Sequence, residues 1–199
     1  MRVTIRAAGS GRPFTDGDSL DLGAPLVVEV DDVVGLEDCR ALIADLERRG
    51  PAPAPISTLD GFVMRPDLRN NTRVMYDDAA RAAALFAALA GVLPARLRRR
   101  HAVGINERFR GYKYTVGQRF APHYDGAFVR SPREASELTL IVYLNDDFTG
   151  GTTDFPHLGL RVQPRAGRAL LFQHLLLHEG CAVEAGVKYA LRTDVMYAD

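Results

Sequence analysis

The stretch Tyr114-Thr-Val-Gly-Gln-Arg-Phe-Ala-Pro-His-Tyr-Asp125 decides the fold, because it ends in a His-x-Asp pair. Residues i and i+2 of an extended strand point to the same side, so His123 and Asp125 can reach one metal ion together. His178 follows much later and can supply a third ligand. Two imidazoles and a carboxylate on one face of an octahedral ion leave positions open, as non-haem iron requires.

The residues after the pair predict a β-rich core. Apolar and β-branched runs separated by Gly and Pro turns are typical of buried strands in a barrel or sandwich rather than in a parallel α/β sheet. His178 is expected to open a turn. The expected strands are 138–145, a strand entered through the turn at 150–155, 167–172 and a long final strand at 187–197.

The N-terminal half predicts two helices beside this core. After a loop at 9–18, Leu26–Val30 is the first firm strand. Leu36–Arg49 has apolar residues at helical spacing and is stopped by Gly50-Pro51, while the Ala-rich segment Ala79–Leu93 ends at Pro94.

The order of these motifs resembles that of the prolyl 4-hydroxylase-like branch of the Fe(II)/2-oxoglutarate-dependent dioxygenases. The matching elements are Tyr114 to Asp125, Gly150 to Phe155, His178 and Lys188. The resemblance implies a mainly β fold with flanking α-helices, whose core is a double-stranded β-helix (jelly-roll) at about 103–199. Residues at about 1–100 would buttress this core, so that 1–199 form a single domain. It also implies that His123, Asp125 and His178 are the metal ligands and the catalytic site.

The same resemblance assigns residues to the co-substrate. Lys188, ten residues after the distal histidine, is expected to bind the far carboxylate of 2-oxoglutarate. Arg192 shares its strand face by alternation and could take or share that role. Tyr143 would donate to the same carboxylate, and Tyr114 would lie near the 2-oxo acid end. Thr139 lies on the strand face of Tyr143; for these three hydroxyl residues, simple packing with a backbone partner is the alternative.

The reaction implied by the resemblance uses Fe(II), 2-oxoglutarate and O2, with ascorbate as an auxiliary reductant. It hydroxylates an unactivated C–H bond while 2-oxoglutarate is decarboxylated to succinate and CO2. Asp125 argues against a halogenase, in which a small residue replaces the carboxylate ligand.

The substrate is expected to be a prolyl or other peptidyl residue by resemblance. The alternatives are a free amino acid or small biosynthetic intermediate, or a non-catalytic sensor module that binds metal or a dicarboxylate. Candidate substrate contacts are Phe128, Arg130 and Arg133 in the loop after the pair, together with the polar clusters Asn70–Arg73 and Asn106–Tyr112.

His174 competes locally with His178, because the two lie four residues apart, as on one helical face. The Glu that normally accompanies a zinc-binding pair of this spacing is missing. His174 is therefore expected to orient a ligand by hydrogen bonding rather than to bind metal.

The composition excludes several partners. The formal net charge is 0, which gives no electrostatic case for nucleic acid or membranes. The basic cluster Arg96–His101 is expected to be a solvated helix end or loop. Two cysteines, Cys39 and Cys181, and an N-terminus without a signal-like apolar run favour a cytoplasmic location. The sequence predicts no oligomeric state.

Overall fold

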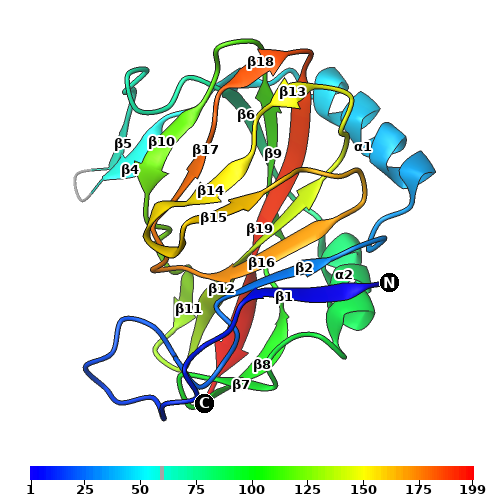
Figure 1. The fold of residues 1–199 in the computed structure, drawn as a ribbon. Helices are drawn as coiled ribbons and strands as arrows, with labels where there is room; N and C mark the ends of the chain where they lie inside the picture. Colours follow the sequence, from blue (N-terminus) through cyan, green and yellow to red (C-terminus); the bar gives the residue numbers. More distant parts are fainter. Residues whose placement is uncertain (59–60) are drawn as a thin grey trace.

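The computed structural model describes residues 1–58 and 61–199, which build a double-stranded β-helix with two helices on its outside (Figure 1). The main sheet follows the order β1-β2-β16-β12-β19-β9-β6-β3, with β11 beside β12 and the β7–β8 pair beside β19. Its strands are β1 (Val3–Ala7), β2 (Val27–Val30), β3 (Ala52–Pro53), β6 (Thr72–Asp77), β7 (Arg96–Leu97), β8 (Arg100–Ile105), β9 (Arg108–Tyr114), β11 (Val129–Ser131), β12 (Glu134–Tyr143), β16 (Ala169–Gln173) and β19 (Lys188–Ala198).

A smaller sheet packs against the main one and carries the metal ligands. Its order is β10 (Phe120–His123), β17 (His178–Gly180), β14 (Thr153–Phe155) and β15 (Leu160–Val162). Side chains from both sheets form one apolar cluster, in which Phe155 and Phe172 meet edge to face at 5.1 Å. Two short pairs and a 3-10 helix complete the structure: β13 (Thr149–Gly150) with β18 (Val183–Ala185), β4 (Ile56–Thr58) with β5 (Gly61–Val63), and η1 (Pro156–Leu158).

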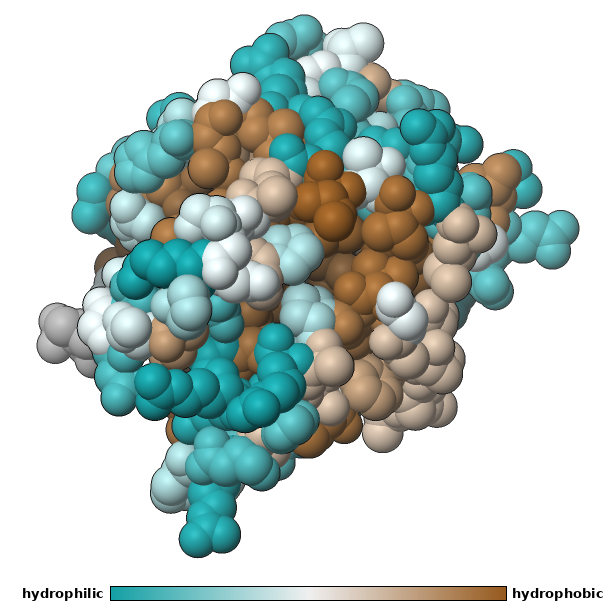
Figure 2. Space-filling view, turned by 60° about the horizontal axis from the view of Figure 1, so that its bottom comes forward, coloured by the Kyte–Doolittle hydropathy of each residue, from teal (hydrophilic) through white to brown (hydrophobic). Residues whose placement is uncertain are grey.

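The helices α1 (Leu36–Arg48) and α2 (Ala79–Leu89) cover the outer face of the main sheet (Figure 1). Their buried residues belong to the same core cluster as Leu140 and Val142 of β12 and Leu191 of β19. At Gly111 on β9 this packing is very close, because an added Cβ would lie 2.1 Å from Leu46 Cδ2 of α1. Figure 2 shows apolar residues gathered on the side of the molecule where α2 lies.

Alternation along the two central strands separates the core from the site. Leu138, Leu140 and Val142 of β12 belong to the core cluster under the helices, whereas Ile141 and Tyr143 face the smaller sheet. On β19, Leu191 packs under the helices, and Lys188, Ala190 and Arg192 line one cavity, as the spacing predicted. The central strands thus present their polar residues to the interior between the sheets.

The structure confirms the mainly β fold and both helices, although α1 ends at Arg48 and α2 already at Leu89. Three expectations were wrong. An earlier strand, β1, pairs with β2. His178 begins a strand rather than a turn.

Third, Arg96–His101 is not a helix end or loop. It forms the β7–β8 hairpin, whose turn residues Arg98 and Arg99 both have positive φ, at 49° and 68°. A two-residue turn of this hand matches the twist of the flanking strands, although its usual Asn-Gly sequence is missing.

Neither of the two helices described is long and apolar enough to cross a membrane.

Candidate metal centre

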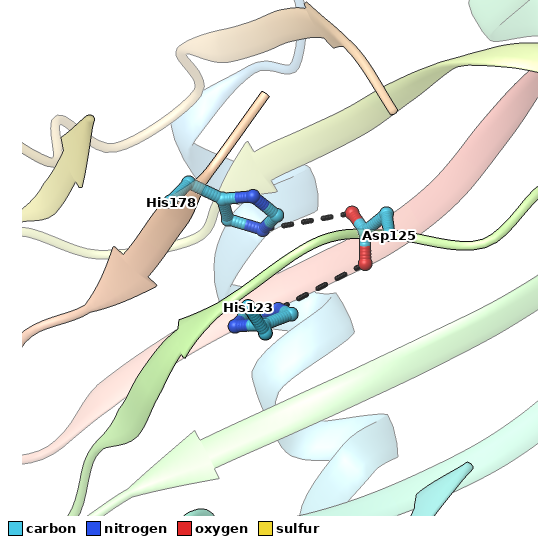
Figure 3. Close-up of side chains that lie close together, drawn as sticks. All are labelled: His123, Asp125 and His178. Atoms are coloured by element: carbon cyan, nitrogen blue, oxygen red, sulfur yellow. Dashed lines mark ion pairs between the residues drawn. The ribbon is translucent and has the colours of Figure 1, made fainter. Parts of the chain in front are cut away.

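The three predicted ligands meet at one point between the sheets (Figure 3). His123 ends β10 and faces His178, the first residue of β17, as its cross-strand partner. Asp125 lies two residues beyond β10, where its backbone N–H donates to the His174 carbonyl. The carboxylate oxygens lie 3.9 Å from His123 Nε2 and 3.6 Å from His178 Nε2. The ligand atoms of all three residues lie within 4.8 Å of one another, so that one ion can reach them all.

Both imidazoles are held in the tautomer that a metal needs. Nδ1 of His123 lies 2.8 Å from the Ala121 carbonyl, and Nδ1 of His178 lies 3.0 Å from the Leu176 carbonyl. A carbonyl only accepts, so each Nδ1 carries the proton and each Nε2 is free to bind metal. The Phe120 ring stacks on His123 at 3.5 Å and fixes its plane. Burial lowers the pKa of His123 to about 4, and that of His178 is also lowered by burial, so both rings are neutral at pH 7.

Asp125 is kept ionised although it is buried. Burial alone would raise the pKa of its carboxyl, but the Arg192 guanidinium, 3.2 Å from Oδ2, and the histidines hold that pKa far below its usual range. The Thr139 hydroxyl donates to the same oxygen at 2.6 Å. Arg192 also pairs with Asp194 at 3.0 Å. Arg192 is therefore engaged with the carboxylate of the metal site.

A chain of hydrogen bonds behind Thr139 fixes this carboxylate. The single Thr139 proton goes to Asp125, so His174 Nδ1, at 2.9 Å, must donate to Thr139. Since burial lowers the pKa of His174 to about 4, its ring is neutral and Nε2 accepts from Ser136 at 2.8 Å. The His174 side chain thus reaches Asp125 through Thr139, and its backbone carbonyl accepts from the Asp125 N–H, which fits the orienting role expected from the sequence.

A narrow cavity beside the three ligands holds the residues predicted for 2-oxoglutarate. Lys188, Tyr143, Tyr114 and Arg192 line it, with apolar walls from Phe120, Ile141 and Ala190. Thr139 does not line this cavity and contacts Asp125 instead. Of the five predicted residues, four therefore face the space next to the metal.

Lys188 is an unusual cation, since only 3% of it is exposed. Its Nζ donates to the Gly151 carbonyl at 2.6 Å and lies 5.3 Å and 5.4 Å from the Tyr114 and Tyr143 ring centroids. Gly151 has φ +61°, a conformation that favours glycine. No carboxylate of residues 1–58 and 61–199 lies within ion-pair distance of Lys188, whereas the buried Arg192 pairs with Asp125 and Asp194. Burial lowers the pKa of Lys188 to about 8.

Both cavity tyrosines are buried, and burial raises the pKa of each well above its usual range, so they remain protonated donors. The Tyr143 hydroxyl lies 2.7 Å from Thr153 Oγ1. Thr153 and Tyr112 also line this cavity but were not assigned to the co-substrate from the sequence, although Thr153 lies in the motif Gly150 to Phe155 and Tyr112 in the cluster Asn106–Tyr112.

A second cavity of about 390 Å³ lies next to the first and shares His123, Asp125 and Arg192 with it. Phe128 lines it, as predicted, but Arg130 pairs with Glu107 and Glu134 and Arg133 is exposed, so neither faces it. Arg73 and Tyr112, from the two predicted polar clusters, do reach the cavity. Four arginines line it, namely Arg69, Arg73, Arg110 and Arg192.

Comparison with known proteins agrees with this geometry. Residues 109–193 match the family model of the 2OG-Fe(II) oxygenase superfamily. A putative prolyl 4-hydroxylase of Acanthamoeba polyphaga mimivirus is 31% identical over 96 residues, which cover 39% of each chain. Prolyl 4-hydroxylase subunit alpha-1 of Bos taurus is 30% identical over 103 residues, covering 44% of this chain and 19% of that protein. The matches thus span well under half of these relatives.

Solved structures share the fold. The viral collagen prolyl hydroxylase of Paramecium Bursaria Chlorella virus-1, in its 2OG complex, superposes with a TM-score of 0.61 at 21% identity, covering 87% of this chain and 96% of that one. A Trichoplax adhaerens prolyl hydroxylase in complex with a hypoxia inducible factor peptide fragment gives 0.63 at 17% identity, covering 87% and 83%.

The fold, the convergence of His123, Asp125 and His178, and the family match point in the same direction: residues 109–193 are similar to the 2OG-Fe(II) oxygenase superfamily. The curated relatives that the chain matches over these short stretches are named as prolyl 4-hydroxylases.

Proposed function

We propose that this protein is an Fe(II)- and 2-oxoglutarate-dependent dioxygenase that hydroxylates an unactivated C–H bond and converts 2-oxoglutarate to succinate and CO2. One observation carries the proposal. A buried lysine without a carboxylate partner lies in the same cavity as two histidines and an aspartate whose metal-binding atoms converge.

The donor set fits Fe(II). His123, Asp125 and His178 would hold the ion through two neutral nitrogens and one ionised oxygen, the set that suits iron with open positions. When bound, iron would supply the oxidation of 2-oxoglutarate and substrate by dioxygen. The protein itself contributes the ionised state of Asp125 and the fixed orientation of both rings.

The narrow cavity fits a dicarboxylate. Lys188 has donors to spare beyond its bond to Gly151, and it would bind the far carboxylate in a dry environment, where charge-assisted hydrogen bonds are strong. The Tyr143 hydroxyl would donate to the same carboxylate, and Tyr114 would border the end nearer the metal. Ile141 and Ala190 exclude water from the carbon chain between these ends.

The relatives favour a prolyl residue of a peptide as the substrate, since their names describe prolyl hydroxylases. A small molecule is the second candidate, and the arginines that line the larger cavity favour it.

Calorimetric titration of the Fe(II)-loaded, oxygen-free protein with 2-oxoglutarate tests the proposal. We expect one molecule to bind per chain and expect His178→Ala to abolish binding that depends on the metal. Binding unchanged by the loss of His178, or no binding at all, would overturn the proposal. The variant Arg161→Ala, at an exposed residue paired with Asp154, is the control.

A further inference from the structure

Arg69 is buried beside the predicted metal site, and residues 1–58 and 61–199 provide no counter-ion for it. It is 4% exposed, and its guanidinium lies 4.7 Å and 4.4 Å from the ring centroids of Tyr112 and Phe120. Nε donates to Asn71 Oδ1 at 2.8 Å, but the buried Nη2 has no hydrogen-bond partner. No carboxylate of the described residues pairs with it. A buried charge without a partner is strongly unfavourable unless something binds there.

Arg73 is a second cation at this cavity that lacks an ion-pair partner among the described residues. It extends from β6, lines the same cavity and is only partly exposed. Among residues 1–58 and 61–199, no side chain forms an ion pair with it. Burial lowers the pKa of Arg73, Tyr112 opposes this, and the positive charges of Arg69, Arg110 and Arg192 lower it further. Two unpaired guanidinium groups thus face one cavity.

The acidic groups at the cavity are already occupied. Asp194 pairs with both Arg110, at 3.2 Å, and Arg192, at 3.0 Å, and Asp125 pairs with Arg192 and is the expected metal ligand. Four arginines therefore share two carboxylates. The charges of a bound Fe(II) ion and of doubly negative 2-oxoglutarate would cancel. The excess positive charge of the four arginines would therefore remain.

We propose that the substrate is a small carboxylic acid whose carboxylate binds Arg69 and Arg73 while its reacting carbon lies next to Asp125. Two observations favour an acid over an internal peptide residue, which is uncharged along its backbone. The planar guanidinium group of Arg69 matches the geometry of a carboxylate, and the rings of Tyr112 and Phe120 already hold it in one orientation. The cavity, about 390 Å³, has the size of small-molecule sites.

The other residues that line the cavity indicate the chemical nature of the substrate beyond its carboxylate. Leu68, Met75 and Phe128 line the same cavity as the arginines and supply apolar surface. A positively charged group on the substrate would be repelled by the arginines that line the cavity. An acid with an apolar body and no free amine, such as an N-acylated amino acid, therefore fits best. This inference rests on the proposed function only in taking the cavity beside the metal as the substrate site.

The test compares acids with their uncharged amides. N-acetyl-L-proline, N-acetyl-L-leucine and N-acetyl-L-phenylalanine, and the three matching primary amides, are titrated calorimetrically into protein loaded with Zn(II) and saturated with 2-oxoglutarate. We expect at least one acid to bind ten times or more tightly than its amide, because a charged hydrogen bond is lost in the amide.

Variants link this preference to the two arginines. Arg73→Gln, at a half-buried position, and Arg69→Gln should each reduce the acid-to-amide ratio at least tenfold. Arg65→Gln removes a charge from the same segment, but its side chain pairs with Asp67 at the surface, so it should preserve the ratio. Retained 2-oxoglutarate binding shows that a variant is folded.

The proposal is overturned if the amides bind as tightly as the acids, if none of the acids binds, or if the preference survives both substitutions. Failure of the proposed function would look different, because 2-oxoglutarate would not bind to the metal-loaded wild type. The same acids and amides titrated without 2-oxoglutarate would then still report on the arginines.

Discussion

Replacing Lys188 with Met should stabilise the ligand-free protein and at the same time weaken 2-oxoglutarate binding. Met preserves the length and apolar stem of the side chain but removes the charge. In the free protein, the ammonium is buried with only the Gly151 carbonyl and two aromatic rings as partners. A purely structural lysine would show the opposite effect on stability, so the two readouts together identify its role.

The magnitudes follow from the surroundings of Lys188. Its pKa falls from 10.5 to about 8, so burial disfavours the charged form by about 3 kcal/mol. Cation–π contacts and the hydrogen bond return roughly 1–2 kcal/mol, which leaves a gain of about 1–2 kcal/mol for Met. The lost interaction with a carboxylate is worth about 1.5–3 kcal/mol, and 2-oxoglutarate should therefore bind roughly 10- to 150-fold more weakly.

The effects also depend on pH in a defined direction. Below pH 8, Lys188 is charged in both the folded and the unfolded chain, so the stability advantage of Met is complete. Between about 8 and 10.5, the folded protein loses the proton first, and the advantage disappears as the pH rises. For the wild type, 2-oxoglutarate affinity should fall above pH 8, because the neutral amine cannot pair with a carboxylate.

Urea denaturation measures the stability, and calorimetry of the metal-loaded protein measures the affinity. Lys113→Met is the matched control, since Lys113 pairs with Glu47 outside the cavity. It should leave 2-oxoglutarate binding unchanged. A Lys188→Met variant that is clearly less stable than the wild type, or that binds 2-oxoglutarate normally, would refute the reasoning.

Further substitutions test the metal site and the packing around it. Thr139→Val removes the 2.6 Å hydrogen bond to Asp125 and should weaken Fe(II) binding about 10- to 100-fold in a metal titration, whereas unchanged affinity would contradict the orienting role. Arg192→Ala should likewise reduce Fe(II) affinity more than 2-oxoglutarate affinity; the reverse order would assign the co-substrate carboxylate to Arg192. Gly111→Ala forces a Cβ to within 2.1 Å of Leu46 and should lower the free energy of unfolding by about 1–3 kcal/mol, measured in urea, and a neutral effect would mean that α1 can shift freely.

The sequence was sufficient to predict that His123, Asp125 and His178 converge, because their identity and order form a motif. Alternation also predicted correctly that Lys188, Ala190 and Arg192 face one cavity. It could not separate the roles of Lys188 and Arg192, since these depend on how far along β19 the metal lies. Only the positions of Asp125 and Asp194 show that Arg192 is already paired.

Strand β9 illustrates a different limit of sequence reasoning. Its sequence, Arg-Phe-Arg-Gly-Tyr-Lys-Tyr, was interpreted in part as a polar cluster, yet it is a central strand between β19 and β6. Its charged residues find partners on other strands, such as Asp77 for Arg108. Arg69 was not singled out in the sequence, because its burial is produced by Tyr112 and Phe120, which lie far away in the sequence.

The most direct test of the account is succinate formation from 2-oxoglutarate by protein reconstituted with Fe(II) without oxygen and then exposed to air. We expect succinate that requires iron and that disappears in His123→Ala, and also in Asp125→Ala, while both variants remain folded. Iron-dependent succinate that persists in these variants would contradict the assignment of the metal centre. No succinate from a wild type that also fails to bind 2-oxoglutarate would contradict the oxygenase function itself.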